Sequence, residues 1–144
     1  MPTERITPVT LDDTEVAELL FTAIGGDRSR LTTAVQLYRD NIRAYLLGIF
    51  VDEAIAGVAG YEVRRHRIAL HHIATTEPRR RCGIGRRLLT EIRSRYPELA
   101  ISAETDSASV GFYLSNGFTA ISLGEKYPGV ERFRVKLDPT KADT

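Results

Sequence analysis

The feature that most limits how this chain can fold is a helix-like segment placed between two strand-like segments. Residues 85–96 carry Leu88 and Ile92 on one helical face and arginines on the others, the pattern of an amphipathic helix. Apolar runs rich in β-forming residues flank it at residues 67–75 and 99–104. Two strands joined through a helix lie parallel in one sheet, with a right-handed crossover. The sequence therefore predicts an α/β fold with a mixed sheet.

The remaining segments predict a mixed, mostly antiparallel sheet of about seven strands flanked by about four helices. Residues 44–51 and 55–63 predict a hairpin around the Asp52-Glu53 turn. Apolar residues three and four apart predict helices at residues 12–24 and 29–40. The expected caps of these helices are Asp12 or Asp13 and Ser29. Further elements are expected as a strand at 5–10, a short helix at 107–115, and a strand pair at 118–123 and 131–137.

Length and composition restrict the class of protein. The 144 residues suit one domain, expected at residues 1–138, followed by a flexible polar tail at 139–144. The 20 Lys and Arg residues against 19 Asp and Glu residues give a net charge of +1, which argues against a nucleic-acid partner. No apolar run approaches the ~20 residues that span a membrane, and the start shows no signal-peptide pattern. A single cysteine cannot build a disulfide or a Cys-based metal site. We expect a cytoplasmic protein without a metal or a membrane partner.

The most informative motif is a basic, glycine-rich loop at residues 79–87, between a predicted strand and a predicted helix. Five of its nine residues are arginine, and Gly83 and Gly85 stand where the backbone adopts positive φ or is closely approached. Free N–H groups at a helix start, beside guanidinium groups, bind phosphate. No Lys follows the glycines as in a P-loop, and the third glycine of a dinucleotide fingerprint is missing. A polyphosphate site is predicted; the alternative is a solvated basic helix start.

This loop resembles the acyl-CoA loop of the GNAT family of N-acetyltransferases. The resemblance rests on Arg80-x-x-Gly83-x-Gly85, which follows the strand segment Ile73-Ala74-Thr75. It implies acetyl-CoA as co-substrate, with the pantetheine arm along Ile73, Ala74 and Thr75 where a local splay exposes their backbone. The residues that would surround the phosphates by the same resemblance are Arg80, Arg81, Cys82, Gly83, Ile84, Gly85 and Arg86.

A second segment carries the same resemblance. Asp106, Tyr113 and Gly117-Phe118 occupy the positions of the family's N-x-x-A-x-x-x-Y…G-F pattern, with Asp106 where Asn is commoner. Together the two motifs extend the resemblance over about residues 3–137. It implies that Asp106 and Tyr113 contact the co-substrate and that Tyr113 is the general acid that protonates the coenzyme sulfur. A phenol is a proton donor at neutral pH. The alternative is a tyrosine that only fills the core.

The sequence offers several candidates for the general base. An attacking amine must lose a proton first, because it is mostly ammonium at neutral pH. His71 is the first candidate, since some family members carry a base at about this place on the strand, and Glu62, Glu104 or water are the alternatives. Successive strand residues point to opposite faces, so His71 is expected on the face of Ile73, opposite His72.

The resemblance implies a transfer of the acetyl group from acetyl-CoA to the primary amine of a small molecule or peptide. In the family the acceptor lies between the first two helices and the final strand pair, and the residues there fit small amines, amino acids, aminoglycosides or a protein N-terminus. A non-catalytic acyl-CoA sensor is the alternative function. Cys82 fills a variable loop position or has a redox role. Edge strands of such sheets often pair between subunits, so a homodimer is the default expectation.

Overall fold

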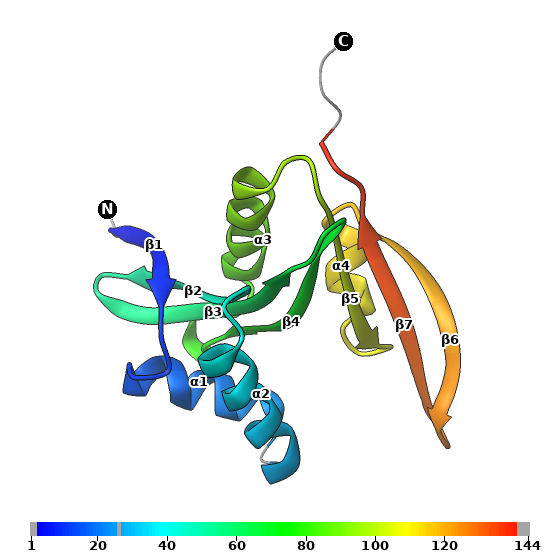
Figure 1. The fold of residues 1–144 in the computed structure, drawn as a ribbon, viewed down its shortest axis with the longest axis horizontal. Helices are drawn as coiled ribbons and strands as arrows, with labels where there is room; N and C mark the ends of the chain where they lie inside the picture. The colour runs from blue at the N-terminus through cyan, green and yellow to red at the C-terminus, as the bar shows by residue number, and fades with distance from the viewer. Residues whose placement is uncertain (1–2, 26, 141–144) are drawn as a thin grey trace.

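The computed structural model, which describes residues 3–25 and 27–140, is built on one seven-stranded sheet with the order β1-β2-β3-β4-β5-β7-β6 (Figure 1). The strands are β1 (Glu4–Val9), β2 (Ala44–Val51), β3 (Ala54–Val63), β4 (Arg67–Thr75), β5 (Ala100–Asp106), β6 (Thr119–Tyr127) and β7 (Val130–Leu137). The helices in the described residues are α1 (Thr14–Ile24), α2 (Arg28–Asp40), α3 (Ile84–Arg95), α4 (Val110–Ser115) and the 3-10 helix η1 (Glu77–Arg79). Only β4 and β5 pair in parallel. The predicted α/β fold with a mixed, mostly antiparallel sheet is confirmed.

The helix starts follow from short carboxylate side chains. Asp13 caps α1, as predicted, because its carboxylate accepts hydrogen bonds from the Glu15 and Val16 amides. The predicted Ser29 cap of α2 is wrong. The carboxylate of Asp27 accepts from the amides of Ser29 and Arg30, so Ser29 already lies inside the first helical turn. The helices thus begin where an aspartate satisfies the first free N–H groups.

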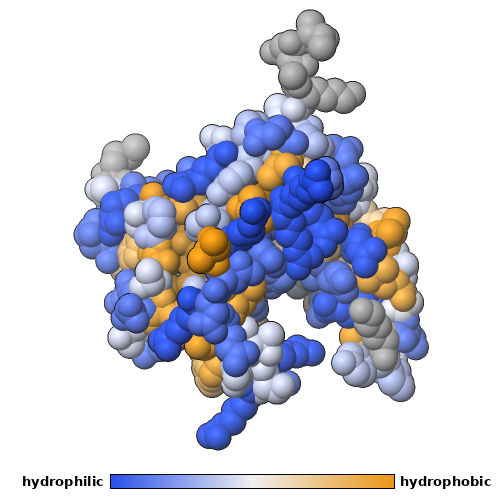
Figure 2. All heavy atoms as spheres, viewed as in Figure 1, coloured by the Kyte–Doolittle hydropathy of each residue, from blue (hydrophilic) through white to orange (hydrophobic). Residues whose placement is uncertain are grey.

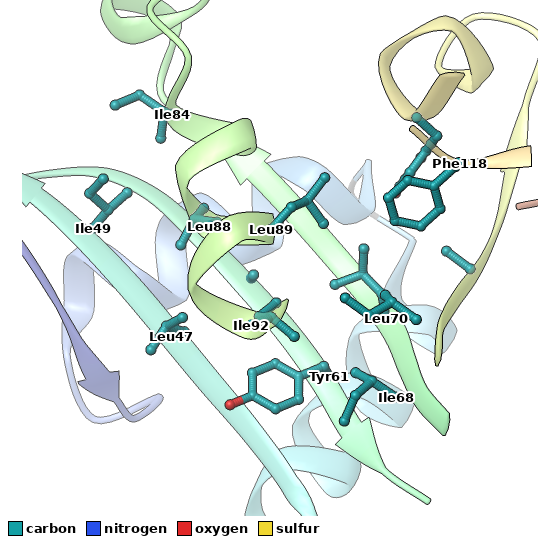
Figure 3. Packing of buried hydrophobic residues seen from close by; sticks show 14 of the residues in the cluster. Leu47, Ile49, Tyr61, Ile68, Leu70, Ile84, Leu88, Leu89, Ile92 and Phe118 are labelled. Atoms are coloured by element: carbon teal, nitrogen blue, oxygen red, sulfur yellow. The ribbon is translucent and has the colours of Figure 1, made fainter. Parts of the chain in front are cut away.

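Helices cover both faces of the sheet. On one face, α3 buries Ile84, Leu88, Leu89 and Ile92 against residues of β2, β3 and β4, in the core that Figure 3 shows. Tyr113 of α4 belongs to the same cluster. We call this side the α3–α4 face. On the opposite side, which we call the α1–α2 face, the two N-terminal helices form a second cluster. Full burial of each large aliphatic side chain stabilises the fold by about 1.5–3 kcal/mol.

The parallel pair β4 and β5 separates soon after it forms. Residue pairs join the strands only from Arg67, opposite Ala100, to Ala69, opposite Ser102. Beyond Ala69, β4 stays paired with β3 as far as Thr75, and Figure 1 shows β5 running away from it. Within the described residues, the β5-facing edge of β4 is therefore unpaired after Ala69. The predicted splay beside Ile73, Ala74 and Thr75 is present.

The chain beyond β7 returns to the end of α3. The Thr140 amide donates a hydrogen bond to the Pro97 carbonyl, and Arg93 donates to the carbonyls of Leu137 and Asp138. Residues 141–144 of the predicted flexible tail lie outside the described residues, so that expectation stays a prediction. None of the helices in the described part of the chain is long and apolar enough to cross a membrane.

Gly57 of β3 lets the first turn of α3 lie directly on the sheet. A Cβ at this position would meet the Ile84 side chain at 2.5 Å and the Ala74 carbonyl oxygen at 3.0 Å. We predict that Gly57→Ala lowers the free energy of unfolding by about 1–3 kcal/mol, because the added methyl group overfills a packed site. Urea denaturation followed by circular dichroism measures this change.

The matched control is Gly111→Ala in α4, where a Cβ would have no atom within 4 Å. Alanine is the better helix former, so this variant is expected to be as stable as the wild type or up to about 1 kcal/mol more stable. Equal stability of the Gly57→Ala variant and the wild type would contradict the packing argument.

Candidate active site

The basic loop predicted to bind phosphate leads into the start of α3 with its backbone amides available. Gly83 has a φ of 77° and precedes the helix without a side-chain cap. Arg81 also has a positive φ, of 64°, which is uncommon for a residue with a side chain. The first four N–H groups of a helix have no carbonyl partner within it. Among the described residues, no group accepts from the amides of residues 83–86. The loop therefore presents donors together with the positive end of the helix dipole.

Guanidinium groups add positive charge at this helix start. Arg80, Arg81 and Arg86 are exposed. No carboxylate in the described ranges forms an ion pair with any of the three. Arg87 differs, because it pairs with Glu4 of β1 at 2.6 Å. The unpaired arginines and the free amides together form an anion site of the kind that a diphosphate requires.

Gly85 is needed because other side chains come close to its backbone, and not because its backbone has a positive φ. A Cβ on Gly85 would come within 2.8 Å of the Phe112 ring of α4 and within 3.8 Å of Ile73 of β4. Phe112 thus lies across the start of α3, next to the unpaired edge of β4. No sequence pattern predicts this contact, since Phe112 lies 27 residues further along the chain and occupies no fixed position of either motif.

Tyr113 combines a buried ring with a reachable hydroxyl. The ring packs edge-on against Phe112 and Phe118, at centroid distances of 5.1 and 5.2 Å. Its hydroxyl has no hydrogen-bond partner among the described residues. In that same part of the chain the only buried side-chain polar atom lacking a partner is Nε of Arg87, so the phenol oxygen of Tyr113 reaches solvent. Burial raises the pKa of Tyr113 to about 12, which keeps the phenol protonated at neutral pH.

Asp106 and Cys82 have local structural contacts. The Asp106 carboxylate accepts a hydrogen bond from the Ser109 amide and turns the chain between β5 and α4. This turn makes α4 shorter than the helix predicted at residues 107–115. Cys82 is exposed, and its thiol lies 3.6 Å from the Arg80 carbonyl oxygen. The predicted contacts of both residues with the co-substrate stay predictions.

His71 lies in a β-bulge of β4. Gly60 pairs with His72 and Tyr61 pairs with Leu70, which leaves His71 as the extra residue. The expectation that His71 and His72 point to opposite faces is therefore wrong, because the bulge interrupts the alternation. Their rings are neighbours, with centroids 6.4 Å apart. Both histidines carry hydrogen bonds on the α1–α2 face.

His71 is bound to a carboxylate of the neighbouring strand. Its Nε2 lies 3.1 Å from Oε1 of Glu62; the same oxygen accepts from Arg64, and Oε2 of Glu62 accepts from Asn41. The hydrogen bond from His71 is the largest cause that lowers the pKa of Glu62, followed in that direction by Arg64. Glu62 is therefore a carboxylate at neutral pH, so His71 donates through Nε2. The other base candidate, Glu104 of β5, lies 3.6 Å from Arg134 of β7.

His72 forms its hydrogen bond with a residue of helix α2, whereas His71 forms its own with a residue of strand β3. Its Nδ1 lies 2.6 Å from the hydroxyl of Tyr38, and the rings are 5.6 Å apart. Burial, followed by the positive charge of His71, lowers the pKa of His72 to about 4. His72 is thus neutral at physiological pH. No sequence pattern predicts the contact between Tyr38 and His72, because the two residues are 34 positions apart.

A depression in the surface, apart from the splay of β4 and β5, is a weaker candidate for the active site. It has a volume of about 770 Å³ and lies at the β1 edge of the sheet, beside Thr10 and Phe50. Three of its charged groups are already engaged, since Arg5 pairs with Glu53 and lies 4.6 Å from the Phe50 ring centroid, and Asp13 caps α1. Figure 2 shows a notch between the α1–α2 part and the β6–β7 hairpin, on the open side of the splay.

Comparison with solved structures identifies the fold as that of acetyltransferases. The structure resembles the ribosomal-protein-S18-alanine N-acetyltransferase from Escherichia coli, with a TM-score of 0.81 and 18% identity over 98% of this chain and 97% of that chain. A putative GNAT acetyltransferase from Desulfovibrio desulfuricans gives a TM-score of 0.76 and 21% identity, over 96% and 99% of the two chains. A GNAT acetyltransferase from Elizabethkingia anophelis with acetyl-CoA bound gives 0.72 and 16%, over 94% and 97%.

The family follows from the sequence. Residues 28–137 match the model of the acetyltransferase (GNAT) domain, which is more than half of the chain. The protein therefore belongs to the GNAT acetyltransferase family, as the two motifs predicted. A comparison with curated proteins finds no match. The structural neighbours share too little sequence to show more than the fold, so the substrate has to be argued from the site itself.

The lowered pKa of His72 predicts a pH dependence of stability. Between pH 6.5, the ordinary value, and about 4, the unfolded chain binds a proton at this residue and the folded chain does not. The free energy of unfolding therefore falls as pH falls through this window, by up to about 1.4 kcal/mol per pH unit. His72→Asn keeps an acceptor for Tyr38 but does not titrate, so its stability is expected to fall less.

Urea denaturation of both proteins between pH 6.5 and about 5 measures the difference, above the range where most carboxylates titrate. Parallel losses of stability in the two proteins would show that His72 takes up its proton in the folded state as readily as in the unfolded chain.

Proposed function

We propose that the protein is an acetyl-CoA-dependent N-acetyltransferase that transfers the acetyl group to a primary amine by direct attack in a ternary complex. The observation that carries this proposal is the juxtaposition at the splay of β4 and β5. The unpaired edge of β4 lies between an anion-binding helix start on one face and a pair of histidines on the other. Two reactants could thus meet at one strand from opposite sides.

The co-substrate would lie on the α3–α4 face. The amides of residues 83–86 and the guanidinium groups of Arg80, Arg81 and Arg86 would hold the diphosphate, since they have no carboxylate partners in the described residues. The backbone groups of Ile73, Ala74 and Thr75 that face away from β3 would hydrogen-bond the pantetheine arm. Acetyl-CoA supplies the activated acetyl group. That related structures contain acetyl-CoA supports this assignment.

Tyr113 would donate its proton toward the departing sulfur. Its hydroxyl is open to solvent although its ring is buried, and it stays protonated because burial raises its pKa to about 12. A phenol with so high a pKa is a weak acid beside an ordinary thiol, whose pKa is ~8.5. The dry surroundings that raise the pKa of the phenol also disfavour a free thiolate. Tyr113 therefore acts best as a strong hydrogen-bond donor that completes proton transfer as the bond to sulfur breaks.

His71 would be the general base. Glu62 accepts from Nε2 of His71, so the lone pair for the amine proton is on Nδ1. A carboxylate that orients a histidine also stabilises the imidazolium that forms. His72 is the weaker base, because its Nδ1 is bound to Tyr38 and its pKa is lowered to about 4. The Glu62 carboxylate would in addition attract an ammonium group arriving on the α1–α2 face.

Tyr113→Phe tests the acid. It is expected to lower kcat by more than about tenfold, because the donor is lost, while the Kd for acetyl-CoA stays nearly unchanged, because the ring packing is kept. Release of free thiol with a panel of amines gives kcat, and titration calorimetry gives Kd. Tyr45→Phe is the matched control, since that residue lies on β2, which β3 separates from β4, and its ring is 5.7 Å from that of Tyr61. An unchanged kcat in the Tyr113→Phe protein removes this residue from the mechanism.

His71→Ala tests the base. Without a proton acceptor at this position, kcat/KM is expected to fall and the acid-side limb of the pH–rate profile to disappear. His66→Ala, at an exposed turn between β3 and β4, is the control and is expected to keep the wild-type profile. A His71→Ala enzyme with the wild-type profile would return the role to Glu104 or to water.

A further inference from the structure

The contact between Tyr38 and His72 is built from three elements that come together on the α1–α2 face. Tyr38 comes from α2, His72 from β4, and Gly60 of β3 pairs with His72 across the sheet. A Cβ on Gly60 would overlap the hydroxyl of Tyr38, so only glycine lets the phenol reach the histidine. The proposed function assigns no chemical step to Tyr38 or His72, although both are largely buried polar residues and His72 is next to the proposed base.

The positions of the protons in this pair can be worked out. Burial, followed by the charge of Glu62, raises the pKa of Tyr38 far above its ordinary value, so the phenol keeps its proton. Nδ1 of His72 is the only partner of that hydroxyl among the described residues, so the phenol proton finds an acceptor there only when Tyr38 donates to Nδ1. A neutral imidazole that accepts at Nδ1 carries its proton on Nε2. His72 is therefore a neutral donor with a fixed Nε2–H.

The Nε2–H group of His72 is not enclosed in the core. No group in the described ranges accepts from it. The one buried side-chain polar atom that lacks a partner in those ranges is Nε of Arg87, so Nε2 of His72 is reachable from outside. The ring of the proposed base His71 is a neighbour of the His72 ring, with the ring centroids 6.4 Å apart.

We propose that His72, oriented by Tyr38, selects the acceptor: its Nε2–H binds an oxygen next to the amine that attacks, so the enzyme prefers α-amino acyl compounds to plain alkylamines. This inference rests on the proposed function. His72 contacts the substrate, and Tyr38 is a positioning residue that acts through it. The amine would lie toward His71 and the Glu62 carboxylate, and the neighbouring carbonyl oxygen toward His72. The donor is uncharged, which suits a carbonyl oxygen and requires no carboxylate on the acceptor.

The test compares two acceptors of similar shape, alaninamide and sec-butylamine, of which only the first has a carbonyl beside the amine. The measured quantity is the ratio of their kcat/KM values. A loss of activity that affects both acceptors equally leaves this ratio unchanged. Tyr38→Phe and His72→Asn are expected to lower the ratio about threefold to tenfold, the value of one neutral hydrogen bond, through a higher KM for alaninamide. Tyr45→Phe is expected to keep the wild-type ratio.

A second measurement does not depend on activity. The ¹⁵N spectrum of His72 is expected to show the Nε2–H tautomer in the wild type and a mixture of tautomers in Tyr38→Phe. An unchanged ratio in both variants, or an equal loss with both amines, would overturn the inference, as would an Nδ1–H tautomer in the wild type. If His72 shows the expected tautomer but no protein releases thiol from acetyl-CoA with either amine, the proposed function is wrong and the acceptor preference falls with it.

Discussion

The separation of β4 from β5 after only three residue pairs is the constraint on which the rest of the molecule depends. A sheet that stayed paired would place its backbone groups in ladder hydrogen bonds and close the route between its two faces. Because β4 instead follows β3, its other edge is unpaired from residue 70 to residue 75. The start of α3 lies beside that edge on one face, and the two histidines lie beside it on the other. The proposed chemistry needs both at one strand.

Three glycines hold the neighbouring elements close to this strand. Gly57 receives Ile84, Gly60 receives Tyr38, and Gly85 receives Phe112. In each case a side chain from a distant segment occupies the space of a missing Cβ. Close approach, rather than left-handed backbone, is the reason for these glycines. Gly83, with its φ of 77°, is the position in the loop where the conformational freedom of glycine is required.

The two faces differ in their electrostatics. On the α3–α4 side, Arg80, Arg81 and Arg86 lie without carboxylate partners in the described residues, which favours an anionic ligand. On the α1–α2 side, Glu62 is held as a carboxylate by His71, Arg64 and Asn41, and His72 is held neutral by burial. The second face therefore suits a cationic amine that becomes neutral on arrival. The anionic reactant would thus bind on the α3–α4 face of β4, and the cationic amine on the α1–α2 face.

The sequence by itself determined the elements, the position of the basic loop between a strand and a helix, and the motif around Tyr113, because periodicity, capping residues and glycine spacing are local properties. It gave the wrong cap at Ser29, where Asp27 competes for the same amides, and the wrong face for His71. A bulge depends on how two strands pair, and alternation along one strand cannot reveal it. Likewise, only the tertiary structure brings Tyr38 to His72 and Phe112 to Gly85, since packing joins residues that no local pattern connects.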